Sequence, residues 1–254
     1  MQSITPFREG AEFTVFRAVI GTGVKAVLKT APHEDISNAN DPSRSARALL
    51  HQEEHLGRYL RSQGIPVPIS LGLVTDGPYP CLIQELVEHD ESCEVSDGHL
   101  APLLSRIHAC TAPRTPVAHE GLPFASCIAR RIARRAHELE KATGVSFPVP
   151  DTTRIESVLK LRGYRPSLLH MDIRPPNILA TAGSIRAIVD WSNALMGDPA
   201  PGVRANRGVV APMHASSRRL REHLRTTADA AYRRPSLSPR RGSGPGASAF
   251  NRAA

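Results

Sequence analysis

The sequence has no long hydrophobic segment. None of its 254 residues lies in a run that approaches the ~18 consecutive apolar residues of a membrane-spanning helix. The opening residues 1–8, MQSITPFR, also lack the apolar core of a secretory signal peptide. We therefore expect a cytoplasmic protein with no membrane partner.

Cysteine is also scarce. The chain has four cysteines, and they are scattered without the paired spacing of metal ligands, at Cys81, Cys93, Cys110 and Cys127. This pattern favours reduced thiols, as in a cytoplasmic protein, and argues against a cysteine-based metal site.

Lysine is absent from the carboxy-terminal region, which is nevertheless the most basic part of the chain. Residues 200–254 contain eleven Arg, one Asp and one Glu, a net charge of +9, so the other 199 residues sum to −1 within the total of +8. The main body therefore lacks the basic charge of a nucleic-acid-binding protein, and the tail lacks interleaved aromatic residues. We expect no nucleic-acid partner.

The composition of this tail is unusual in a second way. Arginine without lysine, among Pro, Gly, Ser and Ala, is what GC-rich DNA encodes when it is read out of frame. We hypothesise that residues 200–254 are a frameshifted or divergent end. One modest helix is predicted around residues 220–231, and the rest is expected to be disordered.

The most informative segment is residues 168–199. It places His170, Asp172 and Asn177 on one tight loop, and Asp190 follows Asn177 by thirteen residues. A carboxylate such as Asp172 can accept the proton of an alcohol that attacks a phosphate. Magnesium prefers hard oxygen ligands, which Asn177 and Asp190 supply. The spacing therefore indicates a phosphotransferase that uses a magnesium-bound nucleotide.

Asp190 is predicted to fold back beside Asn177. The residues between them read as two short strands that turn at Ala182-Gly183, so residues 177–190 form a β-hairpin. The alternative is that Asp172 and Asn177 only make turns and that Asp190 only ends a strand.

Protein kinases share part of this pattern but differ from it in detail. They show His-Arg-Asp with an Asn five residues later, then Asp-Phe-Gly and Ala-Pro-Glu. Here Met171 replaces the Arg, Asp-Trp-Ser at 190–192 replaces Asp-Phe-Gly, and no Ala-Pro-Glu follows. The sequence therefore argues against a protein kinase.

The segment resembles the aminoglycoside phosphotransferase family, the small-molecule branch of the kinase-like fold. Members show His-Gly-Asp-Leu-His-Pro-Gly-Asn, then Ile-Asp-Trp and Gly-Asp-Pro. This chain has His-Met-Asp-Ile-Arg-Pro-Pro-Asn at 170–177, Val-Asp-Trp at 189–191 and Gly-Asp-Pro at 197–199. The resemblance implies that Asp172 is the catalytic base, that Asn177 and Asp190 bind Mg²⁺, and that Asp198 braces the loop.

Three residues depart from the family pattern. Met171 and Pro176 stand where glycine is usual, and Arg174 stands where histidine is usual. A positive φ at position 176 would be incompatible with proline. A second hypothesis is therefore a catalytically impaired, kinase-like nucleotide-binding protein with a truncated substrate lobe.

An ATP-binding lobe should precede this segment. Residues 12–20 and 24–29 have strand composition and are separated by a turn at 21–23, so they predict a hairpin. Residues 26–29, Ala-Val-Leu-Lys, resemble the kinase strand whose lysine binds the α- and β-phosphates, which assigns that role to Lys29. Lys25, next to the turn, is the competing candidate.

A helix should follow, beginning at 41–43 with Ser43 as its cap and running to about Ser62. Three of its leucines share one face, and Glu53 lies within that stripe. A carboxylate on an apolar face needs a cationic partner, so we predict an ion pair between Glu53 and Lys29. The alternative is a glutamate at the helix edge that reaches water.

Nucleotide contacts from the backbone complete the expected lobe. Residues 71–74 and 81–86 read as two strands, and the second enters a hinge where adenine would bond the backbone near Glu85 and Val87. Residues 8–14 are the expected phosphate loop, which has one glycine, Gly10, instead of Gly-x-Gly-x-x-Gly. Backbone amides from Gly10 onward would cover the phosphates.

Three further helices are predicted, at 100–108, 124–142 and 153–161. The second should place four arginines (130, 131, 134 and 135) on a solvated face, and Ile128, Ile132, Ala136 and Leu139 on the other. The acidic residues between 88 and 97 either attract a polyamine-like substrate or form an ordinary exposed loop.

Together these patterns predict an α+β protein with a protein-kinase-like two-lobed fold. A small antiparallel-sheet lobe and hinge at 1–88 would bind ATP, and a mainly helical lobe at 89–199, left incomplete by the tail at 200–254, would catalyse transfer. The expected cofactors are ATP and Mg²⁺. The expected acceptor is a hydroxyl of a small molecule, either an aminoglycoside-like antibiotic or a hydroxylated metabolite. The oligomeric state stays open.

Overall fold

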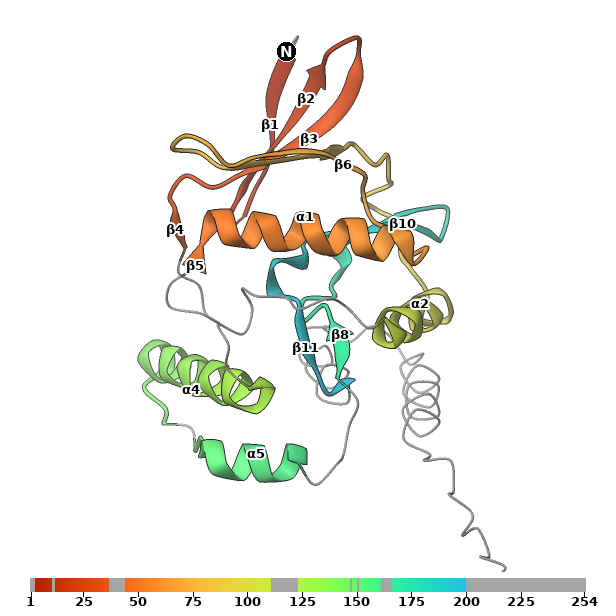
Figure 1. Ribbon diagram of the computed structural model, residues 1–254. Coiled ribbons are helices and arrows are strands. Elements are labelled where there is room, and N and C mark those ends of the chain that lie inside the picture. Colours follow the sequence, from red (N-terminus) through yellow and green to blue (C-terminus); the bar gives the residue numbers. More distant parts are fainter. Residues whose placement is uncertain are drawn as a thin grey trace, which may run out of the picture.

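The amino-terminal lobe is built on one antiparallel sheet. The computed structural model describes residues 3–10, 12–36, 44–110, 123–146, 148–149, 151–160 and 166–199. Five strands pair in the order β1-β2-β3-β7-β6 (Figure 1). They are β1 (Ser3–Glu9), β2 (Thr14–Ile20), β3 (Val24–Thr30), β6 (Ser70–Val74) and β7 (Cys81–Glu85). A separate two-stranded pair is formed by β4 (Asp35–Ile36) and β5 (Arg44–Ser45).

The first strand was not predicted. Residues 8–14 were expected to form a phosphate loop, but β1 continues through Glu9, and β2 begins at Thr14 instead of residue 12. Nearly every residue of β1 is exposed. The strand therefore lacks the alternation of buried and exposed side chains on which a sequence-based prediction depends. The other four strands agree with the predicted ranges to within one or two residues.

Helix α1 (Ala46–Ser62) lies against the sheet (Figure 1). It begins later than predicted: Ser45 is its cap, accepting a hydrogen bond from Ala48 N at 3.1 Å, and residues 41–43, including the predicted cap Ser43, lie outside the described residues. Its leucine face is buried as predicted. The helix contacts β6 and β7 of the sheet and also the short helix η2 (Trp191–Asn193), so it joins the two lobes.

The second lobe combines helices with short strand pairs. The helices are α2 (Asp97–Ala109), α4 (Phe124–Thr143) and α5 (Thr152–Lys160), with a 3₁₀ turn η1 (Pro175–Asn177). The strands are β8 (Ser167–Leu169) paired with β11 (Leu195–Gly197), and β9 (Ile178–Thr181) paired with β10 (Ser184–Ile188). The main apolar core includes Leu56 and Leu60 of α1, Ile107 of α2, and Ile188 and Trp191. This core therefore joins α1 to the second lobe, whereas the sheet packs on α1 through a separate cluster that includes Leu49, Leu50 and Leu82.

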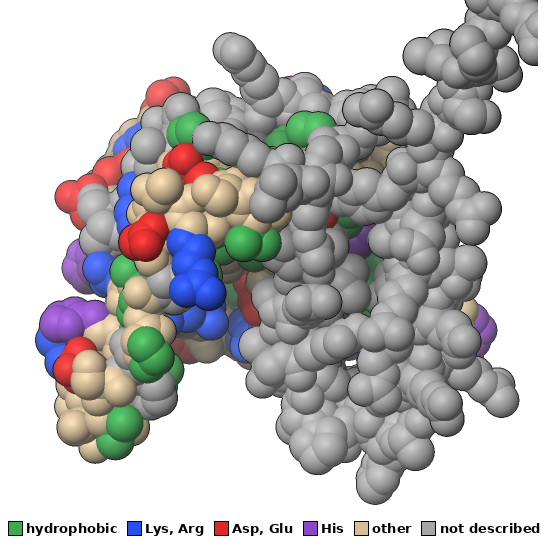
Figure 2. Space-filling model, turned by 90° about the horizontal axis from the view of Figure 1, so that it is seen from below, with side chains coloured by type: hydrophobic (Ala, Val, Ile, Leu, Met, Phe, Trp, Pro, Cys, Tyr) green, Lys and Arg blue, Asp and Glu red, His purple; other side chains and the backbone are tan. Residues whose placement is uncertain are grey.

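The two faces of α4 differ from the prediction. Arg131 is buried, whereas Ile132 and Leu139 of the predicted apolar face are exposed. The helix packs on α5 and on β11, and its buried residues come mostly from its first two turns. Seen from below, the described part of this surface shows apolar side chains scattered between basic and acidic ones (Figure 2). The four arginines therefore do not share one solvated face.

Helices of the described residues are all too short or too polar to cross a bilayer. The boundaries predicted at residues 88 and 199 stay predictions, and the tail at 200–254 lies outside the described residues.

Candidate active site

The β9–β10 hairpin sets the position of Asp190. Ile178 pairs with Ile188, and the ladder is extended by a hydrogen bond from Val189 N to Asn177 O at 3.0 Å. The turn forms at Ala182 and Gly183, both with positive φ. The chain therefore returns Asp190 to the neighbourhood of Asn177, as the sequence predicts.

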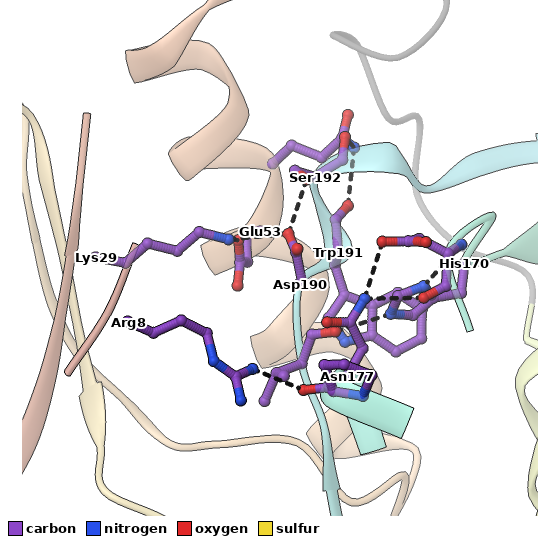
Figure 3. A network of polar contacts seen from close by, with 12 residues as sticks. Arg8, Lys29, Glu53, His170, Asn177, Asp190, Trp191 and Ser192 are labelled. Carbon is purple, nitrogen blue, oxygen red and sulfur yellow. Dashed lines mark hydrogen bonds and ion pairs between the residues drawn. The ribbon is translucent and has the colours of Figure 1, made fainter. Parts of the chain in front are cut away.

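Lys29 joins the two lobes through a pair of carboxylates. Its Nζ lies 2.6 Å from Glu53 Oε2 on α1 and 3.0 Å from Asp190 Oδ1 after β10 (Figure 3). The side chains of Lys29 and Glu53 are only 9% and 3% exposed, whereas that of Asp190 is 31% exposed. The predicted ion pair between Lys29 and Glu53 is present. The competing Lys25 instead pairs with exposed Glu88.

Burial and mutual attraction shift the pKa values of Lys29, Glu53 and Asp190 in different directions. Burial alone lowers the pKa of Lys29, but attraction by Asp190 and Glu53 outweighs it and raises the pKa above its usual value. Burial raises the pKa of Glu53, and the attraction of Lys29 offsets this only in part. Burial also acts to raise the pKa of Asp190, but Lys29 holds it well below its usual range. Asp190 is thus a carboxylate at neutral pH.

Asp172 is held by two side chains of its own loop. Asn177 Nδ2 donates to the Asp172 carbonyl at 2.9 Å and to Asp172 Oδ2 at 3.0 Å. Arg174 Nε donates to the same Oδ2 at 3.0 Å. Both donors act on one oxygen, so Oδ1 of Asp172 is the atom that can accept a proton from an approaching hydroxyl.

His170 fixes the loop from inside. The Asp172 N–H donates to His170 Nδ1 at 3.3 Å, so the other ring nitrogen, Nε2, carries the proton and donates to Val189 O at 3.0 Å. Burial lowers the pKa of His170, which agrees with a neutral ring. The ring packs against Trp191 at a centroid distance of 4.5 Å. His170 therefore ties Asp172 to the strand end that positions Asp190.

The glycine-to-proline departure does not strain this loop. Positive φ occurs at Met171, at 67°, and not at Pro176. Pro175 and Pro176 lie in η1, where a fixed φ and a missing N–H are tolerated at the start of a helical turn. The expected conflict at position 176 is therefore absent, and the strained position is Met171.

Three other predicted residues lie outside this network. Gly10 forms the turn between β1 and β2, with its N–H donating to Phe13 O at 2.9 Å. The Glu85 backbone and side chain both bond Ile69, and the Val87 carbonyl lies 3.0 Å from His89 Nδ1. A pocket of about 360 Å³ is lined mainly by residues of β1, β2 and β3, and also by Leu86 and Glu88, but not by Gly10, Glu85 or Val87. The nucleotide contacts assigned to Gly10, Glu85 and Val87 stay predictions.

Several positioning residues were missed by the sequence analysis. Gln52 of α1 is buried, and its Nε2 donates to the carbonyls of Trp191, Ser192 and Ala194 at 3.1–3.3 Å. Ser192 Oγ also donates to Asp190 Oδ1 at 2.8 Å. Only the polarity of Gln52 on the apolar face of α1 could have indicated its role.

The oxygen atoms of the site fit a nucleotide-bound magnesium ion. Within the described residues, no three His, Cys, Asp or Glu side chains gather as a ready-made metal site. Magnesium needs only one or two protein ligands when phosphates and water complete its shell. Asp190 is ionised, and the hydrogen bonds of Asn177 engage only Nδ2, so its Oδ1 remains for a metal.

Comparison with known proteins identifies a family for this chain. A model of the phosphotransferase enzyme family, APH, matches residues 3–201. No curated protein sequence matches the chain.

Solved structures share the fold. A thermostable mutant of aminoglycoside phosphotransferase APH(4)-Ia, in a complex with ADP and hygromycin B, is 19% identical with a TM-score of 0.59, and the match covers 91% of this chain and 79% of that one. A putative fructosamine-3-kinase from Haemophilus somnus 129PT is 14% identical with a TM-score of 0.59, covering 91% and 82%. The gentamicin complex of APH(2")-IIa is 11% identical with a TM-score of 0.56, covering 91% and 79%.

The family match spans most of the chain, and the solved structures share its overall fold. The chain therefore belongs to the phosphotransferase enzyme family, as its resemblance to the aminoglycoside phosphotransferases implies, and has a protein-kinase-like fold.

Proposed function

We propose that this protein is an ATP-dependent, magnesium-requiring phosphotransferase that moves the γ-phosphoryl group to a hydroxyl of a small molecule. The supporting observation is that Lys29 and Glu53, from the first lobe, meet Asp190, beside the loop that holds Asp172 and Asn177. Residues far apart in sequence thus supply a cation for phosphate, oxygens for metal and a base in one place.

Asp172 is the proton acceptor in this proposal. Asn177 and Arg174 fix its Oδ2, which leaves Oδ1 to take the proton of the attacking hydroxyl. The neutral His170 ring cannot easily compete as a base, because it is buried and Nδ1 already accepts the Asp172 N–H.

Lys29 binds the α- and β-phosphates, and Glu53 orients its ammonium group. Asp190 and Asn177 hold magnesium through carboxylate and amide oxygens. When bound, magnesium neutralises the charge that develops on the phosphates. In this scheme residues up to about 88 bind nucleotide, and residues 89–199 supply the base and the metal ligands.

The acceptor is proposed as an aminoglycoside-like antibiotic or another hydroxylated metabolite. The likeness to two aminoglycoside phosphotransferases and a putative fructosamine-3-kinase supports a small hydroxylated acceptor without choosing among them. Five acidic residues between 88 and 97 would favour a cationic compound.

The test is a nucleotide-consumption screen against a panel of antibiotics, sugars and amino alcohols. Asp172→Asn should keep Mg-ATP affinity within about twofold and lower turnover by at least about 10²-fold, the low end of the range for a general base. Asp190→Asn should weaken Mg-ATP binding as well.

Asp76→Asn is the matched control, because Asp76 is exposed in the turn between β6 and β7. It should turn over as wild type. Near-normal turnover by Asp172→Asn would refute the role of Asp172. Tight Mg-ATP binding by the wild type, with no transfer to any compound, would favour the catalytically impaired nucleotide-binding protein instead.

A further inference from the structure

A β-bulge at the edge of the sheet turns Arg8 towards the active site. In β1, Thr5 pairs with Arg17 and Pro6 with Phe16, but the register then skips Phe7, so that Arg8 pairs with Val15. Directly paired residues of antiparallel strands lie on one face of the sheet. Without the extra residue, Arg8 would point to the opposite face.

The bulge places Arg8 in the same row as Lys29. Val15, the partner of Arg8, is also the partner of Lys29 on β3. Figure 3 shows both side chains extending from the sheet towards the segments that hold Asn177 and Asp190. Bulges often redirect side chains next to active sites, and this one supplies a second cation on the phosphate-facing side of the sheet.

Arg8 spans the lobes without a charged partner among the described residues. Its Nη1 donates to Pro176 O at 3.2 Å, a neutral carbonyl in the turn that leads to Asn177. Arg8 is exposed, and a guanidinium has five N–H donors. Hydrogen bonds between ionised donors and acceptors are about twice as strong as neutral ones. A phosphate at this place would therefore compete well with the Pro176 carbonyl.

The chain also lacks a usual source of phosphate contacts. The segment between β1 and β2 has one glycine, and Gly10 N already donates to Phe13 O. The Gly10 N–H is thus already engaged, and the segment lacks the further glycines that let a backbone approach phosphates closely.

We infer that Arg8 binds the terminal phosphate of the nucleotide and takes over part of the work of the missing glycine-rich loop. This inference rests on the proposed function, because it assigns a further nucleotide-binding residue to the same site. Arg8 leaves Pro176 O when the triphosphate is bound and returns to it when the site is empty.

The test compares nucleotides that differ only in phosphate number. Dissociation constants for AMP, ADP and a non-hydrolysable ATP analogue, with Mg²⁺, are measured by calorimetry on the full chain. Arg8→Ala should weaken binding of the ATP analogue at least about tenfold, the effect of losing one charge-assisted hydrogen bond, and that of AMP less than about twofold. Arg8→Lys should recover part of the loss, because it keeps the charge without the planar fork.

Arg58→Ala is the control, since Arg58 is an exposed arginine of α1 whose partner is Glu54 in the same helix. It should leave all three constants unchanged. If Arg8→Ala weakens the binding of AMP and of the ATP analogue equally, Arg8 only stabilises the contact between the lobes and the inference is wrong. Unchanged dissociation constants in Arg8→Ala would also overturn it. Wild-type protein that binds no nucleotide would instead refute the proposed function.

Discussion

Replacing Lys29 by methionine tests the centre of the site, because it removes the cation that two carboxylates share. Nζ of Lys29 lies 2.6 Å from Glu53 and 3.0 Å from Asp190, and the Glu53 side chain is only 3% exposed. At an effective dielectric constant of about 20, a carboxylate 3 Å away attracts the ammonium by about 5 kcal/mol. Desolvation offsets much of this attraction, and removing one partner of a buried pair costs about 3–5 kcal/mol.

The loss should depend on pH in a definite direction. The pKa of Glu53 is already raised by burial, and loss of Lys29 raises it further. Between the ordinary carboxyl value of 4.5 and the raised folded value, the folded variant holds a proton that the unfolded chain releases. The stability that Lys29→Met loses relative to wild type should therefore grow as pH rises through this window, so the difference between the two proteins is larger at pH 8 than at pH 5.

Urea unfolding followed by tryptophan fluorescence is the assay. The chain has one tryptophan, Trp191, which is 2% exposed and next to Asp190, so its emission reports on this region. Lys25→Met is the control: Lys25 lies on the same strand, but its partner Glu88 is exposed, and no measurable shift is expected. Adding Glu53→Gln to Lys29→Met should restore part of the lost stability, because the uncompensated charge is gone.

Wild-type stability of Lys29→Met at both pH values would refute the reasoning. So would a difference from wild type that shrinks as pH rises, because buried His170 and His108 titrate in both proteins and only the change at Glu53 separates them.

Two further predictions concern other parts of the site. Gly197→Ala should destabilise the protein by about 1–3 kcal/mol in urea unfolding, because the added Cβ would lie 2.3 Å from the Phe124 ring, whereas Gly98→Ala, with 3.7 Å to its nearest atom, should not. In Asp190→Asn, the melting temperature should fall less steeply than in wild type as the solution is acidified below about pH 4. The depressed pKa of Asp190 stabilises the wild type above the unfolded value near 3.8, and this contribution is lost as pH falls towards the folded value. The same fall of melting temperature with acid in Asp190→Asn and in wild type would contradict the depressed pKa of Asp190.

The sequence predicts the parts of the site that depend on local pattern. The hairpin that returns Asp190 to Asn177 follows from apolar strands around a turn, and the pairing of Glu53 with Lys29 follows from a charge on an apolar helix face. Both are decided within a few tens of residues, where periodicity and turn chemistry are strong.

What the sequence could not show depends on tertiary contacts. Strand β1 is mostly exposed, and its side chains do not alternate between buried and exposed as in a half-buried strand. The sequence therefore predicts neither the strand nor the bulge that redirects Arg8. The exposure of Ile132 and Leu139 on α4 depends on which elements pack against that helix. Arg174 pairs with Asp172 only because the loop folds back on itself.

The departures from the family's glycines are compatible with an ordered site, for a different reason at each position. Pro176 needs no left-handed backbone, because it continues a turn that Pro175 begins. Met171 does have φ of 67°, which costs a residue with a side chain about 1–2 kcal/mol. The cost is met by packing, since Met171 contacts the cluster of Phe124, Cys127 and Leu195. Backbone strain of this kind persists only where the surroundings fix it, and here it orients the N–H of Asp172 towards His170. Methionine in place of the family's usual glycine at position 171 therefore lowers the stability of the protein. It nevertheless preserves the Asp172 geometry that the proposed reaction needs.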